Sequence, residues 1–140
     1  MRITLSDEAR QYIAYFESAT DATVRDCLLF DERVVLLIAA GEMGTAIGPG
    51  GKHIRAVEDD IGTTVELVED AETARAFVEN ALAPAAVRHV TISEQGGECV
   101  AYVEIPDPDR GIAIGADGKN IHTARKLVRR HYEIDDIQLT

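Results

Sequence analysis

Gly44-Thr-Ala-Ile-Gly-Pro-Gly-Gly-Lys-His-Ile54 and Gly111-Ile-Ala-Ile-Gly-Ala-Asp-Gly-Lys-Asn-Ile121 are two stretches of this chain that follow one pattern. They lie 67 residues apart, and seven of their eleven positions are identical. A single G-x-x-G arises by chance in many chains. Two copies that also share the preceding Ala-Ile and the following Lys-x-Ile indicate a duplicated structural unit.

Each copy has the chemistry of a phosphate-binding loop. Glycines between two helices permit positive φ and leave no Cβ in the way, so another backbone can approach closely. The helix that follows offers its free N–H groups and its positive dipole end at the same place. Lys52 and Lys119 directly follow the two loops and add a charge. A tight helix–helix turn would explain the glycines alone, but it needs no cation, so a pair of nucleic-acid-binding loops is the favoured interpretation.

Hydrophobic periodicity gives both halves the same order of elements: helix, strand, strand, helix, G-x-x-G, helix, strand. The halves join near Glu69–Asp70 with almost no linker. This predicts an α+β chain with a first domain over residues 1–69 and a second over residues 70–140. So tight a join favours two domains packed as one rigid body.

Caps and apolar positions refine the expected elements. Ser6 is expected to cap a helix that runs to about Ser18, and Asp70 a helix over residues 71–82. A long helix is predicted over residues 119–132. Four isoleucines are expected to anchor the short helices around the loops to a sheet, namely Ile47, Ile54, Ile114 and Ile121.

The charge of the chain is unusual for a nucleic-acid binder. Its formal net charge is −11, and 3 lysines and 11 arginines stand against 25 acidic residues. Proteins that bind phosphate backbones are usually basic. An acid-rich, lysine-poor composition fits a salt-loaded cytoplasm, where the Debye length falls to about 3 Å at 1 M salt. We therefore hypothesise a halophilic source.

Composition also indicates the cellular compartment and which kinds of site to expect. The N-terminus turns acidic at once, and no run of about 18 apolar residues exists, so a cytoplasmic protein is expected. The two cysteines, Cys27 and Cys99, are predicted to be buried free thiols. No C-x-x-C and no zinc-type histidine spacing occurs, so neither a metal site nor a cofactor is expected.

The two loops do not match the glycine-rich motifs of enzymes. A Walker A loop requires G-x-x-x-x-G-K-[ST], but its first Gly is replaced by Ala46 and Ala113, and its Ser/Thr by His53 and Asn120. None of the three serines has a nucleophile-like context. No catalytic residue is predicted, and the chain is expected not to be an enzyme.

Taken together, these residues resemble the KH family, whose G-x-x-G loop clamps about four nucleotides of a single strand. The element order is similar to the type II arrangement, which implies an αββααβ unit, a three-stranded mixed sheet and helices packed on one face. Over residues 1–140 the chain resembles the archaeal NusA-like transcription factors, which have two tandem KH domains. The stretch from Gly41 through the first loop to Ile54 carries that closer resemblance.

The resemblance implies binding of single-stranded RNA by a monomer during transcription elongation or termination, with RNA polymerase as a further candidate partner. The residues expected to bind RNA lie in the loops and the helix starts after them: Gly48, Pro49, Gly50, Gly51, Lys52, His53, Arg55, Gly115, Ala116, Asp117, Gly118, Lys119, Asn120 and His122.

Two departures from a typical KH loop leave alternatives open. Pro49-Gly50 and Ala116-Asp117 replace basic residues that are frequent at these positions, and Asp117 should repel a phosphate at low salt. The first loop is therefore expected to hold RNA and the second to extend it. One alternative is a KH-fold protein-interaction scaffold with weak or no RNA binding. Another is a KH protein associated with the ribosome or with RNA processing.

Overall fold

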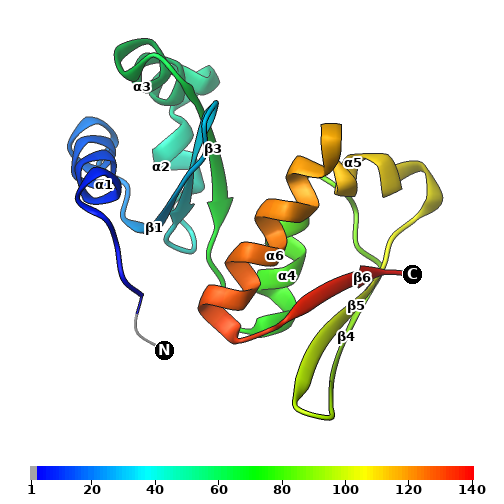
Figure 1. Ribbon diagram of the computed structural model, residues 1–140. Helices are drawn as coiled ribbons and strands as arrows, with labels where there is room; N and C mark the ends of the chain where they lie inside the picture. The colour runs from blue at the N-terminus through cyan, green and yellow to red at the C-terminus, as the bar shows by residue number, and fades with distance from the viewer. Residues whose placement is uncertain (1–2) are drawn as a thin grey trace. The chain divides into compact units, whose positions relative to one another are not determined.

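The computed structural model describes residues 3–140 and divides into two compact units, one ending at Asp70 and the other beginning at Ala71. The predicted boundary after Glu69 lies one residue earlier. Each unit has its own sheet, and in each the helices lie on one side of it (Figure 1). The predicted α+β class, with two αββααβ units, is confirmed.

Within residues 3–70 the first unit contains three α-helices and three strands, and a 3-10 turn (Pro49–Gly51) forms its loop. In chain order they are α1 (Asp7–Thr20), β1 (Val24–Leu29), β2 (Arg33–Ile38), α2 (Met43–Ile47), α3 (Lys52–Ile61) and β3 (Thr64–Glu69). The sheet order is β1-β2-β3. β1 pairs with β2 in antiparallel fashion, and β2 pairs with β3 in parallel. This mixed sheet is the predicted one.

The second unit repeats the arrangement. Its elements are α4 (Ala74–Leu82), β4 (His89–Gln95), β5 (Glu98–Glu104), α5 (Arg110–Ile114), α6 (Lys119–Tyr132) and β6 (Asp136–Leu139). β4 pairs antiparallel with β5, which pairs in parallel with β6. The predicted bounds of α6 are confirmed.

The start of the first helix was predicted correctly in the first unit and wrongly in the second. The Ser6 hydroxyl accepts from the Ala9 N–H at 3.1 Å, as expected, although α1 ends at Thr20 and not near Ser18. Thr73, not Asp70, caps α4, and its hydroxyl accepts from the Ala76 N–H at 3.2 Å. Asp70 instead prolongs the strand pairing, because its N–H donates to the Ile38 carbonyl of β2, and the helix begins only at Ala74.

The core of each unit lies between the helices and the sheet. All six residues of β2 are buried. In the short helices, however, the buried residues are Ala46 and Ala113, while Ile47 and Ile114 are 36% and 40% exposed. The prediction that these two isoleucines anchor the helices was wrong. A small alanine lets the helix lie close to its neighbours, which turns the isoleucine beside it outward.

Neither cysteine forms a disulfide, but only one of the two is buried. Cys27 is buried on β1, whereas Cys99 on β5 is half-buried. Partial burial, with Glu94 and Asp135 nearby, raises the pKa of the Cys99 thiol. Within residues 3–140 no group of three or more potential metal ligands occurs, and no helix is long and apolar enough to cross a membrane.

Candidate nucleic-acid interface

The two loops begin at glycines with the same unusual backbone. Gly48 has φ 75° and ψ 169°, and Gly115 has φ 79° and ψ 169°. This combination is essentially restricted to glycine. Each glycine N–H closes the preceding short helix, through the Gly44 carbonyl in the first unit and the Gly111 carbonyl in the second, both at 2.9 Å. The two copies therefore enter the loop in one geometry.

The rest of each loop also matches. The third position is left-handed in both, with φ 61° at Gly50 and φ 55° at Asp117. The fourth position is left-handed as well, with φ 80° at Gly51 and φ 73° at Gly118. Asp is one of the few non-glycine residues that tolerate this region. The second loop thus keeps the shape of the first although its sequence differs.

Side chains of α3 hold the first loop. His53 Nδ1 lies 2.8 Å from the Thr45 carbonyl, so this nitrogen donates. Arg55 Nη1 donates to the Gly50 carbonyl at 2.6 Å. A Cβ at position 48 would lie 2.5 Å from His53 Cγ, and one at 51 would lie 3.0 Å from Arg55 Nη1. The imidazole and the guanidinium therefore pack against the inside of this loop.

One amide does the same in the second loop. Asn120 Nδ2 lies within hydrogen-bonding distance of three carbonyl oxygens, at 3.1 Å from Ala113, 3.3 Å from Leu82 and 3.4 Å from Ile112. A Cβ at Gly115 would lie 2.8 Å from Asn120 Cβ. Asn120 occupies the position of His53, and His122, an exposed residue of α6, occupies that of Arg55. The chemistry of the side-chain ties at the His53 position therefore differs between the copies.

The loops also differ in the groups they offer to a phosphate. Lys52 and Lys119 begin α3 and α6, where the helix dipole favours an anion. Pro49 has no N–H, whereas Ala116 at the matching position has one. Against this, the exposed Asp117 places a carboxylate in the second loop, where the first has Gly50. The second loop thus gains a donor and an unfavourable charge together.

Apolar side chains flank both loops and were missed as site residues. Ile47, Ile112 and Ile114 are exposed on the short helices that lead into the loops. The sequence signal was present, because Ala-Ile precedes both loops, but it was interpreted as core. These isoleucines place exposed apolar surface beside both glycine loops.

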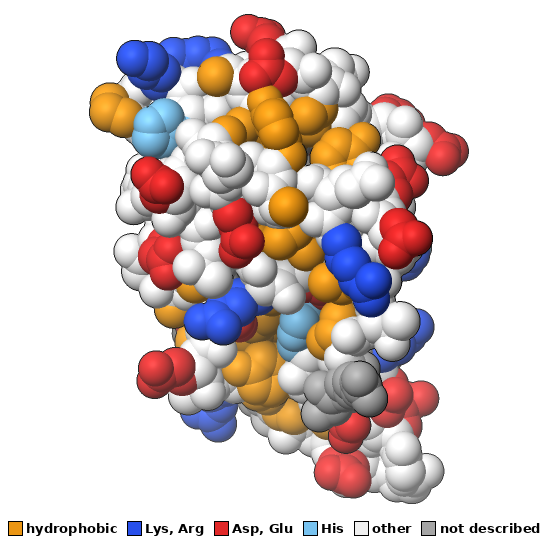
Figure 2. Space-filling view, turned by 90° about the vertical axis from the view of Figure 1, so that its left-hand side faces the viewer, with side chains coloured by type: hydrophobic (Ala, Val, Ile, Leu, Met, Phe, Trp, Pro, Cys, Tyr) orange, Lys and Arg blue, Asp and Glu red, His pale blue; other side chains and the backbone are white. Residues whose placement is uncertain are grey.

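Charge is divided unequally between the units. Residues 1–70 carry 6 Lys and Arg against 14 Asp and Glu, a formal charge of −8, whereas residues 71–140 carry 8 against 11, a formal charge of −3. α3 has two Lys/Arg and three acids, and α6 has five Lys/Arg and no acid. Figure 2 shows acidic side chains dispersed over the visible face, with basic ones only in small groups.

Two of the α6 arginines support the last strand. Arg125 donates to the Ile137 carbonyl at 3.0 Å and pairs with Asp136 at 3.0 Å. Arg129 donates to the Asp135 carbonyl at 3.0 Å. These guanidinium groups fasten α6 to residues 135–137 at the start of β6, so only part of the charge of α6 is available to an incoming strand.

Comparison with known proteins places this geometry in a family. Residues 74–140 match the model of the NusA-like second KH domain, and residues 9–79 match a KH domain model. "Probable transcription termination protein NusA" of Halobacterium salinarum is 60% identical over 140 residues and covers 100% of both chains. The protein of that name from Halococcus morrhuae is 53% identical over 139 residues and covers 99% of both.

A solved structure has the same fold. The crystal structure of APE1850 matches with a TM-score of 0.85 and 27% sequence identity, covering 97% of this chain and 100% of that one.

Proposed function

The chain belongs to the NusA-like family of KH-domain proteins, and from this premise we propose that it binds single-stranded RNA through its two glycine loops and acts in transcription elongation or termination. One observation carries the proposal. Two loops of different sequence keep one backbone geometry, and each is followed by a lysine at a helix N-terminus. A mere turn requires the glycines but not the lysine.

The mechanism is binding without catalysis. The phosphate backbone approaches the loop where no Cβ intervenes, and the helix N-terminus and the lysine neutralise it. Bases then rest on the exposed isoleucines. Aromatic residues are only 5% of the chain, so stacking platforms are few. Affinity per domain is modest, and two linked sites on one strand increase it.

The remaining site residues divide by role. We propose that Lys52 and Lys119 contact phosphate, and that His53, Arg55 and Asn120 act mainly by holding the loops. The protein works as a monomer in a salt-loaded cytoplasm, the setting that its acidity and its relatives in Halobacterium and Halococcus support. RNA polymerase is the proposed machine on which it acts.

RNA binding is tested by fluorescence anisotropy with a labelled single-stranded RNA of about twelve nucleotides, since each KH domain clamps about four. The titration is done at about 0.15 M and about 2 M KCl. Lys52→Gln combined with Lys119→Gln should weaken binding about tenfold or more at the lower salt. Arg10→Gln combined with Arg75→Gln, which removes two charges from the exposed surfaces of α1 and α4, is the control. No detectable binding by the unaltered protein at either salt would favour the scaffold alternative.

The role in transcription is tested separately. The protein is added to stalled elongation complexes upstream of a terminator, and read-through is compared with and without the two lysine substitutions. A change in read-through that the lysine variant loses supports the proposal. Co-purification in molar KCl with ribosomal subunits, and without polymerase, would instead assign the protein to the ribosome.

A further inference from the structure

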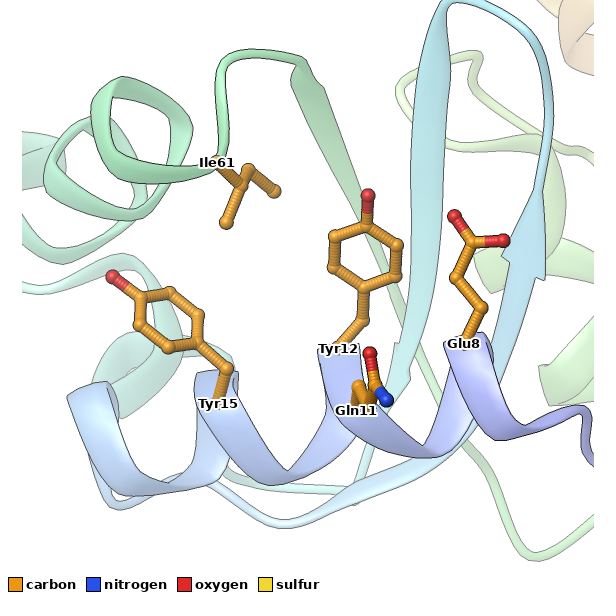
Figure 3. A pocket seen from close by; sticks show the side chains of 5 residues that line it. All are labelled: Glu8, Gln11, Tyr12, Tyr15 and Ile61. Atoms are coloured by element: carbon orange, nitrogen blue, oxygen red, sulfur yellow. The ribbon is translucent and has the colours of Figure 1, made fainter.

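The first unit has a hollow that its RNA-binding loop does not use. It has a volume of about 350 Å³ and is lined by Glu8, Gln11, Tyr12 and Tyr15 of α1 and by Ile61, the last residue of α3. Figure 3 shows Glu8 and Tyr12 projecting from neighbouring turns of α1 to the same side, with Ile61 directed toward α1 from the end of α3. The hollow thus has aromatic walls and a carboxylate at one end.

The apolar side chains of the hollow are held by packing, whereas its polar groups can still bind a ligand. Tyr12, Tyr15 and Ile61 pack partly buried against the core of the unit. The Tyr15 hydroxyl also donates to the Asp60 carboxylate of α3, which ties the two helices together. Within residues 3–140, no hydrogen bond or ion pair engages the Glu8 carboxylate, the Gln11 amide or the Tyr12 hydroxyl. The hollow is therefore preformed and polar at its rim.

The second unit fills the corresponding junction with its own side chains. α6 has 14 residues and α3 only 10, although both begin at the lysine after the loop. The extra turn brings the His131 and Tyr132 rings to 5.5 Å and 5.0 Å from the ring of Phe77 on α4. The Tyr132 hydroxyl donates to the Ala71 carbonyl at 2.7 Å. In the first unit, Gly62 ends α3 at Ile61 and leaves this place open.

We propose that the hollow receives an arginine side chain from an exposed segment of a protein partner. Guanidinium groups stack on aromatic rings and pair with carboxylates through a planar fork, so tyrosine faces beside a carboxylate suit arginine better than a neutral group. The formal charge of −8 on this unit attracts a cationic segment. Ring stacking also persists where salt screens exposed charges.

The same unit already holds one arginine in this way. Arg33 lies over the Phe30 ring at 4.1 Å from its centroid and pairs with Glu66 at 2.9 Å. The hollow offers the same two elements, an aromatic face and a carboxylate, to a side chain from outside. The partner surface is distinct from the RNA loops, so the protein would join an RNA strand to a basic protein segment.

The test is an NMR titration of the full chain with acetyl-Gly-Ser-Arg-Gly-Ser-amide. Changes in chemical shift should concentrate at Gln11, Tyr12, Tyr15 and Ile61. The expected Kd is about 1 mM, an affinity that one stacked and charge-paired side chain can provide. The peptide with citrulline, which has the shape of arginine without its charge, should bind about tenfold more weakly. No shift at these residues up to about 10 mM arginine peptide would overturn the proposal.

Variants separate binding from folding. Glu8→Gln should weaken binding of the arginine peptide about fivefold. Asp7→Asn, which removes a neighbouring charge outside the hollow, should leave that binding unchanged. Tyr12→Leu keeps apolar volume but removes the ring, and should also weaken binding if its thermal unfolding is close to that of the unaltered protein. Equal effects of Glu8→Gln and Asp7→Asn would show general charge attraction and reject the site.

Two other occupants have their own readouts. Shifts at the same residues on addition of the single-stranded RNA, without competition by the peptide, would assign the hollow to RNA. Changes in the chemical shifts of the same residues on dilution of the protein alone would assign the hollow to a second copy of the chain. Either result would overturn the proposal of a partner arginine.

Discussion

The two glycine loops share a backbone but differ in nearly everything that surrounds it. The first loop has no acid, yet it lies on α3, where acids outnumber bases, in a unit of formal charge −8. The second loop carries Asp117 but lies on α6, which has five Lys/Arg and no acid. The comparison teaches that loop shape and local charge are independent properties of this fold, since Gly50 and Asp117 share one left-handed backbone while the charges of the loops and of the helices after them differ.

This division leaves the ranking of the loops to experiment. From the sequence, the first loop was predicted to hold RNA and the second to extend it, because Asp117 repels phosphate. The basic α6 favours the opposite order, although Arg125 and Arg129 already bind β6.

Gly48→Ala and Gly115→Ala should have the largest effects. Each new Cβ meets a side chain at 2.5 to 2.8 Å, in a backbone region that only glycine readily adopts. Strain and clash together should lower the free energy of unfolding by about 3 kcal/mol and remove RNA binding by that loop. Gly118→Ala, whose Cβ meets open space, is the control and should cost about 1 kcal/mol. Urea denaturation measures both, and equal losses at positions 115 and 118 would contradict this account.

Asn120→Ala should destabilise more than His53→Ala. Asn120 Nδ2 faces three backbone carbonyl oxygens from a partly buried position, so its removal should cost about 2 kcal/mol. His53 makes one exposed bond to the Thr45 carbonyl, worth about 0.5 kcal/mol. Thermal unfolding of the two variants measures the difference. A larger loss at His53 would mean that the first loop depends on its side-chain tie more than the second does.

A reciprocal exchange at the third loop position should move affinity between the units. Gly50→Asp should weaken RNA binding and Asp117→Gly should strengthen it, each by about threefold to tenfold at low salt. Both changes suit the backbone, because Asp117 and Gly50 already share nearly the same left-handed φ. Both effects should shrink in molar KCl, where the Debye length is about 3 Å. If the double exchange restored the original affinity, the two loops would contribute equally.

High pH should loosen the helix pair of the first unit alone. The hydrogen bond to Asp60 raises the pKa of Tyr15, with smaller contributions from burial and from the Asp60 charge. A folded-state pKa above the unfolded value of about 10 means that this contribution is complete below pH 10 and is lost as the pH rises through the folded value. The effect should be small because the pair is exposed. Amide hydrogen exchange of α1 at pH 9 and 11 tests it. The exchange of α4 in the second unit is the internal reference, and Tyr15→Phe is the control variant.

Several details of the fold followed from short-range signals. Ser6 and the apolar spacing after it located α1, Gly62 located the end of α3, and the lysines after the glycines located the starts of α3 and α6. These signals act through neighbouring residues in the chain, so they can be interpreted without tertiary contacts.

Other details depended on partners far away in the chain. Asp70 was predicted as a cap, but it continues the pairing of β3 with Ile38 of β2, and Thr73 caps α4. Ile47 and Ile114 were predicted as anchors, but Ala46 and Ala113 occupy the buried positions. Asn120 was predicted to touch RNA, and its amide lies against carbonyls of α4 and α5. Such choices arise from the competition of distant groups for one backbone donor or one buried position.

The sequence by itself determined the duplicated unit, the loops and the family to which the chain belongs, because glycine torsions and helix starts are local properties. Only the tertiary structure decided which side chains hold each loop, which isoleucines remain exposed and where the α1–α3 hollow lies. Those features result from contacts between residues 5 to 45 positions apart in the chain, as for Arg55 with Gly50 and Tyr15 with Asp60. No local pattern specifies such contacts.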